Sequence, residues 1–120
     1  GNMNINLYQY KATVTKVYDG NTITVEIDLG FKAAVKGEKI RLNRINAPEI
    51  RGDSREEGLK SRDYLRLLIL NKEILLETIK DKKGKYCRYL GEIFLKQADG
   101  SWLNINDELV NKELASYKEY

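Results

Sequence analysis

Residues 39–49 contain an arginine and a glutamate that a single strand and its following turn could present to a ligand. The first half alternates apolar Ile40 and Leu42 with polar residues, which is typical of a strand with one buried face. Arg41 then lies on the polar face. The chain's only proline must end the strand, because it has no N–H for a sheet ladder, so Glu49 follows in a turn. An anion-binding guanidinium and a proton-accepting carboxylate could together form an active site.

Composition narrows the chemistry that is available to such a site. The 120 residues include no histidine and one cysteine, Cys87, which excludes a zinc site and a histidine-based triad. Any hydrolysis would use carboxylates, arginine, lysine, tyrosine or a metal bound through oxygen. The 21 basic and 18 acidic residues give a net charge of +3, which permits a polyanionic partner without requiring one.

Two other short segments extend the pattern of residues 39–49. Upstream, residues 17–22 read Val-Tyr-Asp-Gly-Asn-Thr, and downstream, residues 84–88 read Gly-Lys-Tyr-Cys-Arg. In this order the three segments resemble the staphylococcal nuclease (thermonuclease) family. The resemblance covers most of the chain.

The resemblance implies an activity and a set of site residues. Members of that family hydrolyse phosphodiester bonds of nucleic acid with a calcium ion, one glutamate and two arginines. Carried over by motif, Glu49 is the general base for the attacking water, and Arg41 and Arg88 bind the phosphate. Lys85 and Tyr86 match positions that contact the phosphates and base of a bound nucleotide. The implied partner is single-stranded or locally melted DNA or RNA.

The expected metal site departs from the family pattern. The family reads Asp-Gly-Asp-Thr and Asp-x-Pro-Glu, and two of these aspartates hold calcium where this chain has Asn21 and Asn46. Asparagine keeps an oxygen ligand but carries no charge. Since ligand charge tunes calcium affinity, we expect a site of Asn21, Asn46 and the Ala47 carbonyl to bind Ca²⁺ weakly or not at all. The alternative function is a nuclease-like module that binds nucleic acid or a protein without turnover.

The surrounding patterns predict a mainly β fold. Strands are expected over five segments: residues 10–17, 22–29, 38–45, 73–79 and 88–95. We expect a loop over residues 30–37 and a basic turn over residues 81–85.

Two helices complete the expected order of elements. Ser54 with Glu57 forms a capping-box signature for a helix over residues 55–70, and Asn104 or Asn106 caps a second helix near the end. Three strands, a helix, two strands and a helix is the order of a five-stranded OB-fold barrel, a fold that commonly binds nucleic acid.

The length of the chain suits one domain, which we expect over residues 1–120. Gly1 and Asn2 precede Met3, as a cloning remnant would. No apolar run reaches the length of a membrane span, and no secretory leader is recognised. Cytoplasmic location and secretion after removal of a leader both stay open. DNA or RNA preference, endo- or exonucleolytic action and oligomeric state are equally open.

Overall fold

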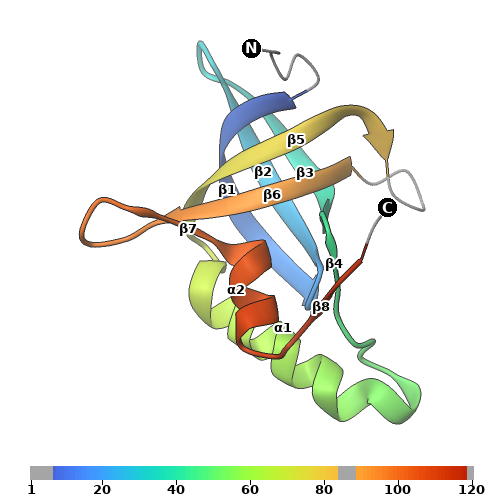
Figure 1. Ribbon diagram of the computed structural model, residues 1–120. Helices are drawn as coiled ribbons and strands as arrows, with labels where there is room; N and C mark the ends of the chain where they lie inside the picture. The colour runs from blue at the N-terminus through green and yellow to red at the C-terminus, as the bar shows by residue number, and fades with distance from the viewer. Residues whose placement is uncertain (1–6, 84–88, 119–120) are drawn as a thin grey trace, which may run out of the picture.

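The structure, a computed structural model, describes residues 7–83 and 89–118 (Figure 1). The strands in this part of the chain are β1 (Leu7–Asp19), β2 (Thr22–Gly30), β3 (Ala33–Leu42), β4 (Ile45–Asn46), β5 (Glu73–Lys83), β6 (Tyr89–Lys96), β7 (Trp102–Asn104) and β8 (Ser116–Tyr117). The helices are the short 3-10 helix η1 (Gly52–Ser54), α1 (Arg55–Ile69) and α2 (Ile105–Asn111). None of these helices is long and apolar enough to cross a membrane.

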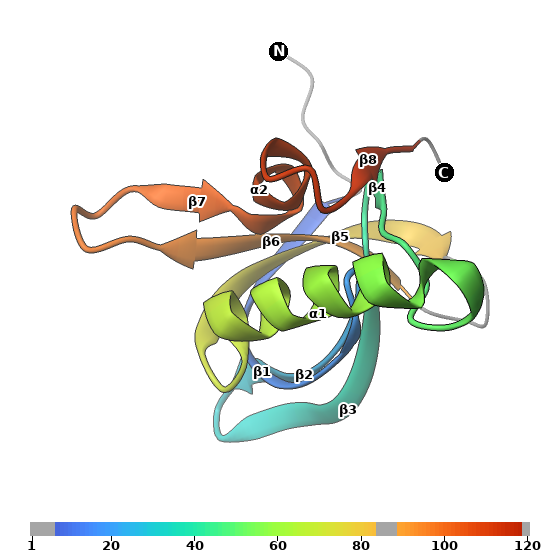
Figure 2. The same cartoon turned by 90° about the horizontal axis from the view of Figure 1, so that it is seen from below.

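Five of the strands form a closed barrel. Antiparallel pairing runs in the order β3, β2, β1, β5, β6, and a parallel pairing of β3 with β6 closes the ring. β7 extends the sheet beyond β6, while β4 and β8 form a separate two-stranded ribbon. Seen from below, α1 lies across one end of the barrel and α2 lies beside β6 (Figure 2). The mainly β, five-stranded OB-type fold expected from the sequence is confirmed.

The alternating segments supply the core, because one face of each strand points into the barrel. Ile40 and Leu42 of β3 are fully buried, as is Ile23 of β2. The inner face of α1 contributes Leu65 and Ile69, which cover the end of the barrel. The expected helix over residues 55–70 is confirmed to within one residue at its end.

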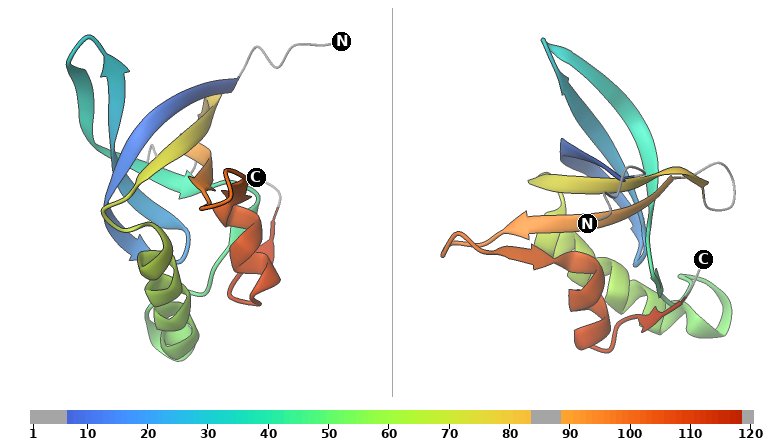
Figure 3. Two further views of the ribbon diagram at one scale, coloured as in Figure 1. Left: turned by 90° about the vertical axis from the view of Figure 1, so that its left-hand side faces the viewer. Right: turned by 45° about the horizontal axis from the view of Figure 1, so that its top comes forward.

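The expected loop over residues 30–37 is wrong. β3 begins at Ala33, so that only Phe31 and Lys32 turn between β2 and β3. Both have positive φ values, 52° and 64°, as the tightest hairpin turns require. Phenylalanine and lysine are unusual in that conformation, so composition could not indicate the turn. The hairpin stands out from the barrel (Figure 3).

Two other strand boundaries differ from the expectation. The predicted strand over residues 38–45 breaks after Leu42, because Arg44 adopts a left-handed conformation with φ of 68°, and Ile45 then pairs with β8. The predicted turn over residues 81–85 is wrong for residues 81–83, which belong to β5.

The helix starts also differ in part. Ser54 precedes α1, yet its Oγ makes no capping bond and instead donates to the carbonyl oxygen of Glu49 at 2.9 Å, so the expected capping box is wrong. Asn104 caps α2 as expected, accepting the backbone N–H of Asp107 at 3.0 Å.

Candidate functional site

Three segments meet at Arg41 on β3. The register of β2 and β3 pairs Thr22 with Arg41, which places the β1–β2 turn directly beside the arginine. The N–H of Leu42 also donates to the carbonyl oxygen of Asn21 at 2.8 Å. After the turn at residues 43–44, β4 brings Asn46 back to the same guanidinium.

Two amide side chains hold Arg41 in place. Its Nη2 donates to Oδ1 of Asn46 at 3.1 Å. With the Asn21 amide turned so that its oxygen faces donors and its nitrogen faces an acceptor, Nη2 also donates to Oδ1 of Asn21 at 3.0 Å. The Asn21 oxygen also accepts the N–H of Ala47 at 3.2 Å, and its Nδ2 donates to Oδ1 of Asp19 at 2.9 Å. The neighbouring donors and acceptors define this orientation of the amide. These five residues are called the Arg41 cluster below.

The Arg41 cluster is packed on its inner side and exposed on its outer side. Asn21 is 3% exposed and Ala47 5%, whereas Asn46 is on the surface. Gly20 packs tightly here: a Cβ on it would come within 2.7 Å of the Cβ atoms of Ala47 and Ser61 of α1. The β1–β2 turn therefore packs directly against both Ala47 and α1, with no room for a side chain at position 20.

Glu49 lies two residues beyond Ala47, and the contacts that position it run through its backbone. Its carbonyl oxygen accepts the Ser54 hydroxyl at 2.9 Å. Gly58 of α1 approaches so closely that a Cβ there would collide with that same carbonyl. The side chain of Glu49 is exposed. The helix thus fixes the backbone of the turn and leaves the carboxylate in solvent.

Arg88, Lys85 and Tyr86 lie outside the described residues, and so does Cys87. The start of β6 is described, and its parallel register places Tyr89 beside Ile40 and Leu90 beside Arg41. The chain therefore enters β6 next to the strand that carries Arg41.

The donors present are a poor fit to calcium. Calcium takes six to eight oxygen ligands, usually with several carboxylates. Both amide oxygens expected to hold it accept hydrogen bonds from a cationic nitrogen, Arg41 Nη2. Among the described residues no three His, Cys, Asp or Glu side chains gather as a metal-binding group. Weak or absent calcium binding at Asn21, Asn46 and Ala47 stays a prediction.

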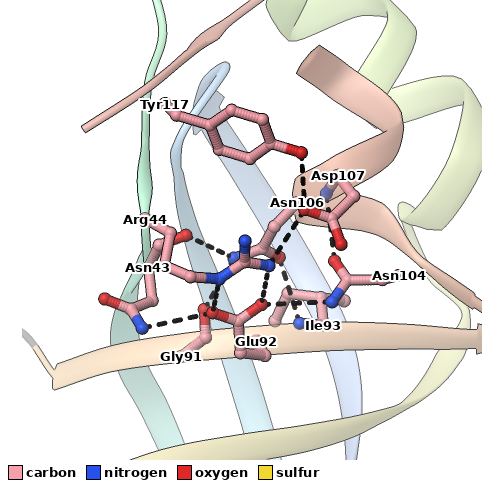
Figure 4. Close-up of polar contacts among 9 residues, drawn as sticks. All are labelled: Asn43, Arg44, Gly91, Glu92, Ile93, Asn104, Asn106, Asp107 and Tyr117. Carbon is pink, nitrogen blue, oxygen red and sulfur yellow. Dashed lines mark hydrogen bonds and ion pairs between the residues drawn. The ribbon is translucent and has the colours of Figure 1, made fainter. Parts of the chain in front are cut away.

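A second polar cluster, missed by sequence reasoning, fixes the turn after Arg41 (Figure 4). Glu92 of β6 is 9% exposed and accepts two bonds from Arg44, both at 2.8 Å. It also accepts Nδ2 of Asn43 at 3.1 Å and Nδ2 of Asn104 at 3.2 Å. The pKa of Arg44 is raised further above its usual value, chiefly by the hydrogen bonds to Glu92.

Asn106, at the start of α2, joins the same turn to β6. It is fully buried, and its Oδ1 accepts the N–H of Ile93 at 3.1 Å. Its Nδ2 donates to the carbonyl oxygens of Asn43 at 2.9 Å and Gly91 at 3.0 Å (Figure 4). One side chain thereby satisfies three backbone groups where β3 ends beside β6.

The only sequence signal for this cluster is the presence of polar residues at positions where apolar ones would suit a core. Glu92 stands between Gly91 and Ile93 in an otherwise apolar strand, and Asn106 directly follows buried Ile105. The sequence does not indicate the hydrogen-bond partners of either residue. Arg44, for example, lies 48 positions from Glu92.

The closed five-stranded barrel, with a helix across one end and a polar site beside the β1–β2 turn, defines an OB-type domain. A family model described as staphylococcal nuclease homologue matches residues 39–120. The chain belongs to the staphylococcal nuclease homologue family. A comparison with curated proteins finds no match.

Proposed function

We propose that this domain binds single-stranded or locally melted nucleic acid through a phosphodiester group at the Arg41 cluster, and hydrolyses that bond. The observation that carries the proposal is the placement of one arginine by residues from three segments: Asn21, Asn46 and the barrel strand itself. Arginine suits this role, since its planar fork matches the oxygens of a phosphate and stays charged at all working pH values. Membership of a nuclease-type family supports the same reading.

In the proposed hydrolysis each residue of the site has a separate role. Arg41 holds the phosphate, and Glu49, exposed two residues beyond Ala47, accepts a proton from the attacking water. The water oxygen bonds to phosphorus, the bond to the leaving oxygen breaks, and that oxygen takes a proton from solvent. By resemblance Arg88 is the second cation at the phosphate, with Lys85 and Tyr86 beside the nucleotide.

Binding without turnover is the second candidate function. One observation favours it: Asn21 and Asn46 are neutral, and their oxygens are engaged with Arg41. A site of this kind can bind a phosphate, whereas hydrolysis also needs Glu49 at the attacking water.

Labelled single-stranded DNA and RNA distinguish the two functions. We expect wild-type protein to cleave at least one of them, and Glu49→Gln to bind equally well while cleaving about two to three decades more slowly. Arg41→Ala should weaken binding as well as cleavage. Glu57→Gln, which neutralises another exposed glutamate on α1, is the matched control and should cleave like wild type.

Binding with no cleavage in wild-type protein would support the second function. If Glu49→Gln leaves cleavage unaffected, Glu49 is not the general base. An absence of binding to either nucleic acid would overturn both functions.

A further inference from the structure

We infer that Asn21 and Asn46 orient the Arg41 guanidinium and do not hold a divalent cation, so that phosphate binding at this site needs no metal. The inference rests on the proposed binding of a phosphodiester at the Arg41 cluster. It does not depend on whether the bound ester is then hydrolysed.

Asn21 fits a metal-free site better than an aspartate would. Its amide is both donor and acceptor: Nδ2 donates to Asp19 at 2.9 Å while Oδ1 accepts from Arg41 at 3.0 Å. An ionised carboxylate has no proton to donate. An aspartate at position 21 would therefore face the Asp19 carboxylate at hydrogen-bond distance in a buried place, and a bound cation would relieve that repulsion. The amide removes the need for one.

Asn46 completes the arrangement from the exposed side. Its oxygen accepts from the same nitrogen of Arg41 as the Asn21 oxygen does, at 3.1 Å, so Nη2 lies between the two amides. This fixes the plane of the guanidinium. Because neither amide carries a charge, the guanidinium is oriented without being neutralised by them.

The result is an oriented positive charge beside the two positions, Asn21 and Asn46, where the family pattern implies metal ligands. An oriented guanidinium attracts a phosphate without ordering at the moment of binding, which is the property that a preformed cation site supplies. It differs from calcium in being covalently part of the chain. Chelators should therefore have no effect on binding.

The test measures binding of a short fluorescein-labelled single-stranded DNA by polarisation, in EDTA and in excess calcium, with cleavage-deficient Glu49→Gln protein. We expect the two Kd values to agree within about twofold, because uncoupled sites leave each other's affinity unchanged. Arg41→Lys should weaken binding by about tenfold or more in both buffers, since an ammonium is a point charge that does not reproduce the planar fork.

Restoring charge should restore metal dependence. In Asn21→Asp/Asn46→Asp protein we expect binding to be about tenfold or more tighter in calcium than in EDTA, since carboxylates raise calcium affinity. The double variant Asn71→Asp/Asn111→Asp lowers the net charge by the same amount as Asn21→Asp/Asn46→Asp, but at two exposed positions away from the cluster. Its binding should stay insensitive to calcium.

Thermal melting gives a readout that is independent of nucleic acid. Calcium should raise the Tm of Asn21→Asp protein and leave that of wild type unchanged. Wild-type binding that fails in EDTA and returns with calcium, or a wild-type Tm raised specifically by calcium, would overturn the inference while leaving the proposed function intact. Loss of binding in both buffers would overturn the proposed function instead.

Discussion

Arg44 in the turn after β3 and Glu92 on β6 form a bidentate ion pair, in which the Nε–Oε2 and Nη2–Oε1 distances are both 2.8 Å. The pair crosses the place where β3 and β6 run parallel and close the barrel. Arg44 also reaches Asp107 of α2 at 3.0 Å and lies over the ring of Tyr117 at 5.8 Å. One side chain thus connects the closing strands, α2 and β8 within three residues of Arg41.

Removing the charge of Glu92 should destabilise the fold. Glu92→Gln keeps the shape but replaces one acceptor oxygen with an amide NH2 that faces donors, so we expect a loss of about 2–3 kcal/mol in the free energy of unfolding. Urea denaturation measures it. Asp63→Asn, which breaks the exposed Arg62 pair, should change stability by less than about 0.5 kcal/mol. Equal effects of the two variants would contradict the importance of the Arg44–Glu92 pair, in which the carboxylate is buried.

Asn106→Ala should cost about 2–4 kcal/mol, because the buried N–H of Ile93 and the carbonyl oxygen of Asn43 lose this hydrogen-bond partner. The Gly91 carbonyl keeps the N–H of Asn43 at 2.8 Å. Asn111→Ala at the exposed end of α2 is the control and should be nearly neutral. Chemical denaturation followed by tryptophan fluorescence compares them. A cost below about 1 kcal/mol would mean that other groups replace the amide.

Gly58→Ala should damage the site from a distance. Alanine in a helix interior normally gains up to about 1 kcal/mol over glycine. Here the new methyl group would collide with the Glu49 carbonyl, so we expect lower stability and reduced nucleic-acid cleavage. Lys60→Ala, at an exposed position of the same helix, should alter neither. Normal stability and cleavage in Gly58→Ala protein would show that the turn at Glu49 tolerates displacement.

The pKa of Asp99 should depend on Ser101. The Ser101 hydroxyl at 2.6 Å, and then its backbone N–H at 2.9 Å, hold the pKa of Asp99 below its usual value. A lowered folded pKa stabilises the β6–β7 turn above the unfolded pKa, and the effect is lost as pH falls through the folded pKa. Ser101→Ala should raise the pKa of Asp99 in an NMR titration. Ser116→Ala should not, and an unchanged titration in Ser101→Ala would refute the assignment.

Much of the barrel was predictable because it follows from local alternation. Ile23, Ile40 and Leu42 recur at every second position of their strands, and all three are buried. The positions of Arg41 and Glu49 relative to the strand and the proline were predictable for the same reason. The turn of Phe31 and Lys32 was not, since nothing in those side chains favours positive φ and the flanking strands impose it.

The sequence by itself determined the family, the OB-type order of elements, and the neutrality of positions 21 and 46, because each depends on residue types at short spacing. Only the tertiary structure decided what those neutral amides do. It brings Asn21, Arg41 and Asn46 together from three segments and turns both amide oxygens to the guanidinium. The same holds for Glu92 and Arg44. Hydrogen-bond partners far apart in sequence are chosen by how strands close a barrel, and no local pattern records that choice.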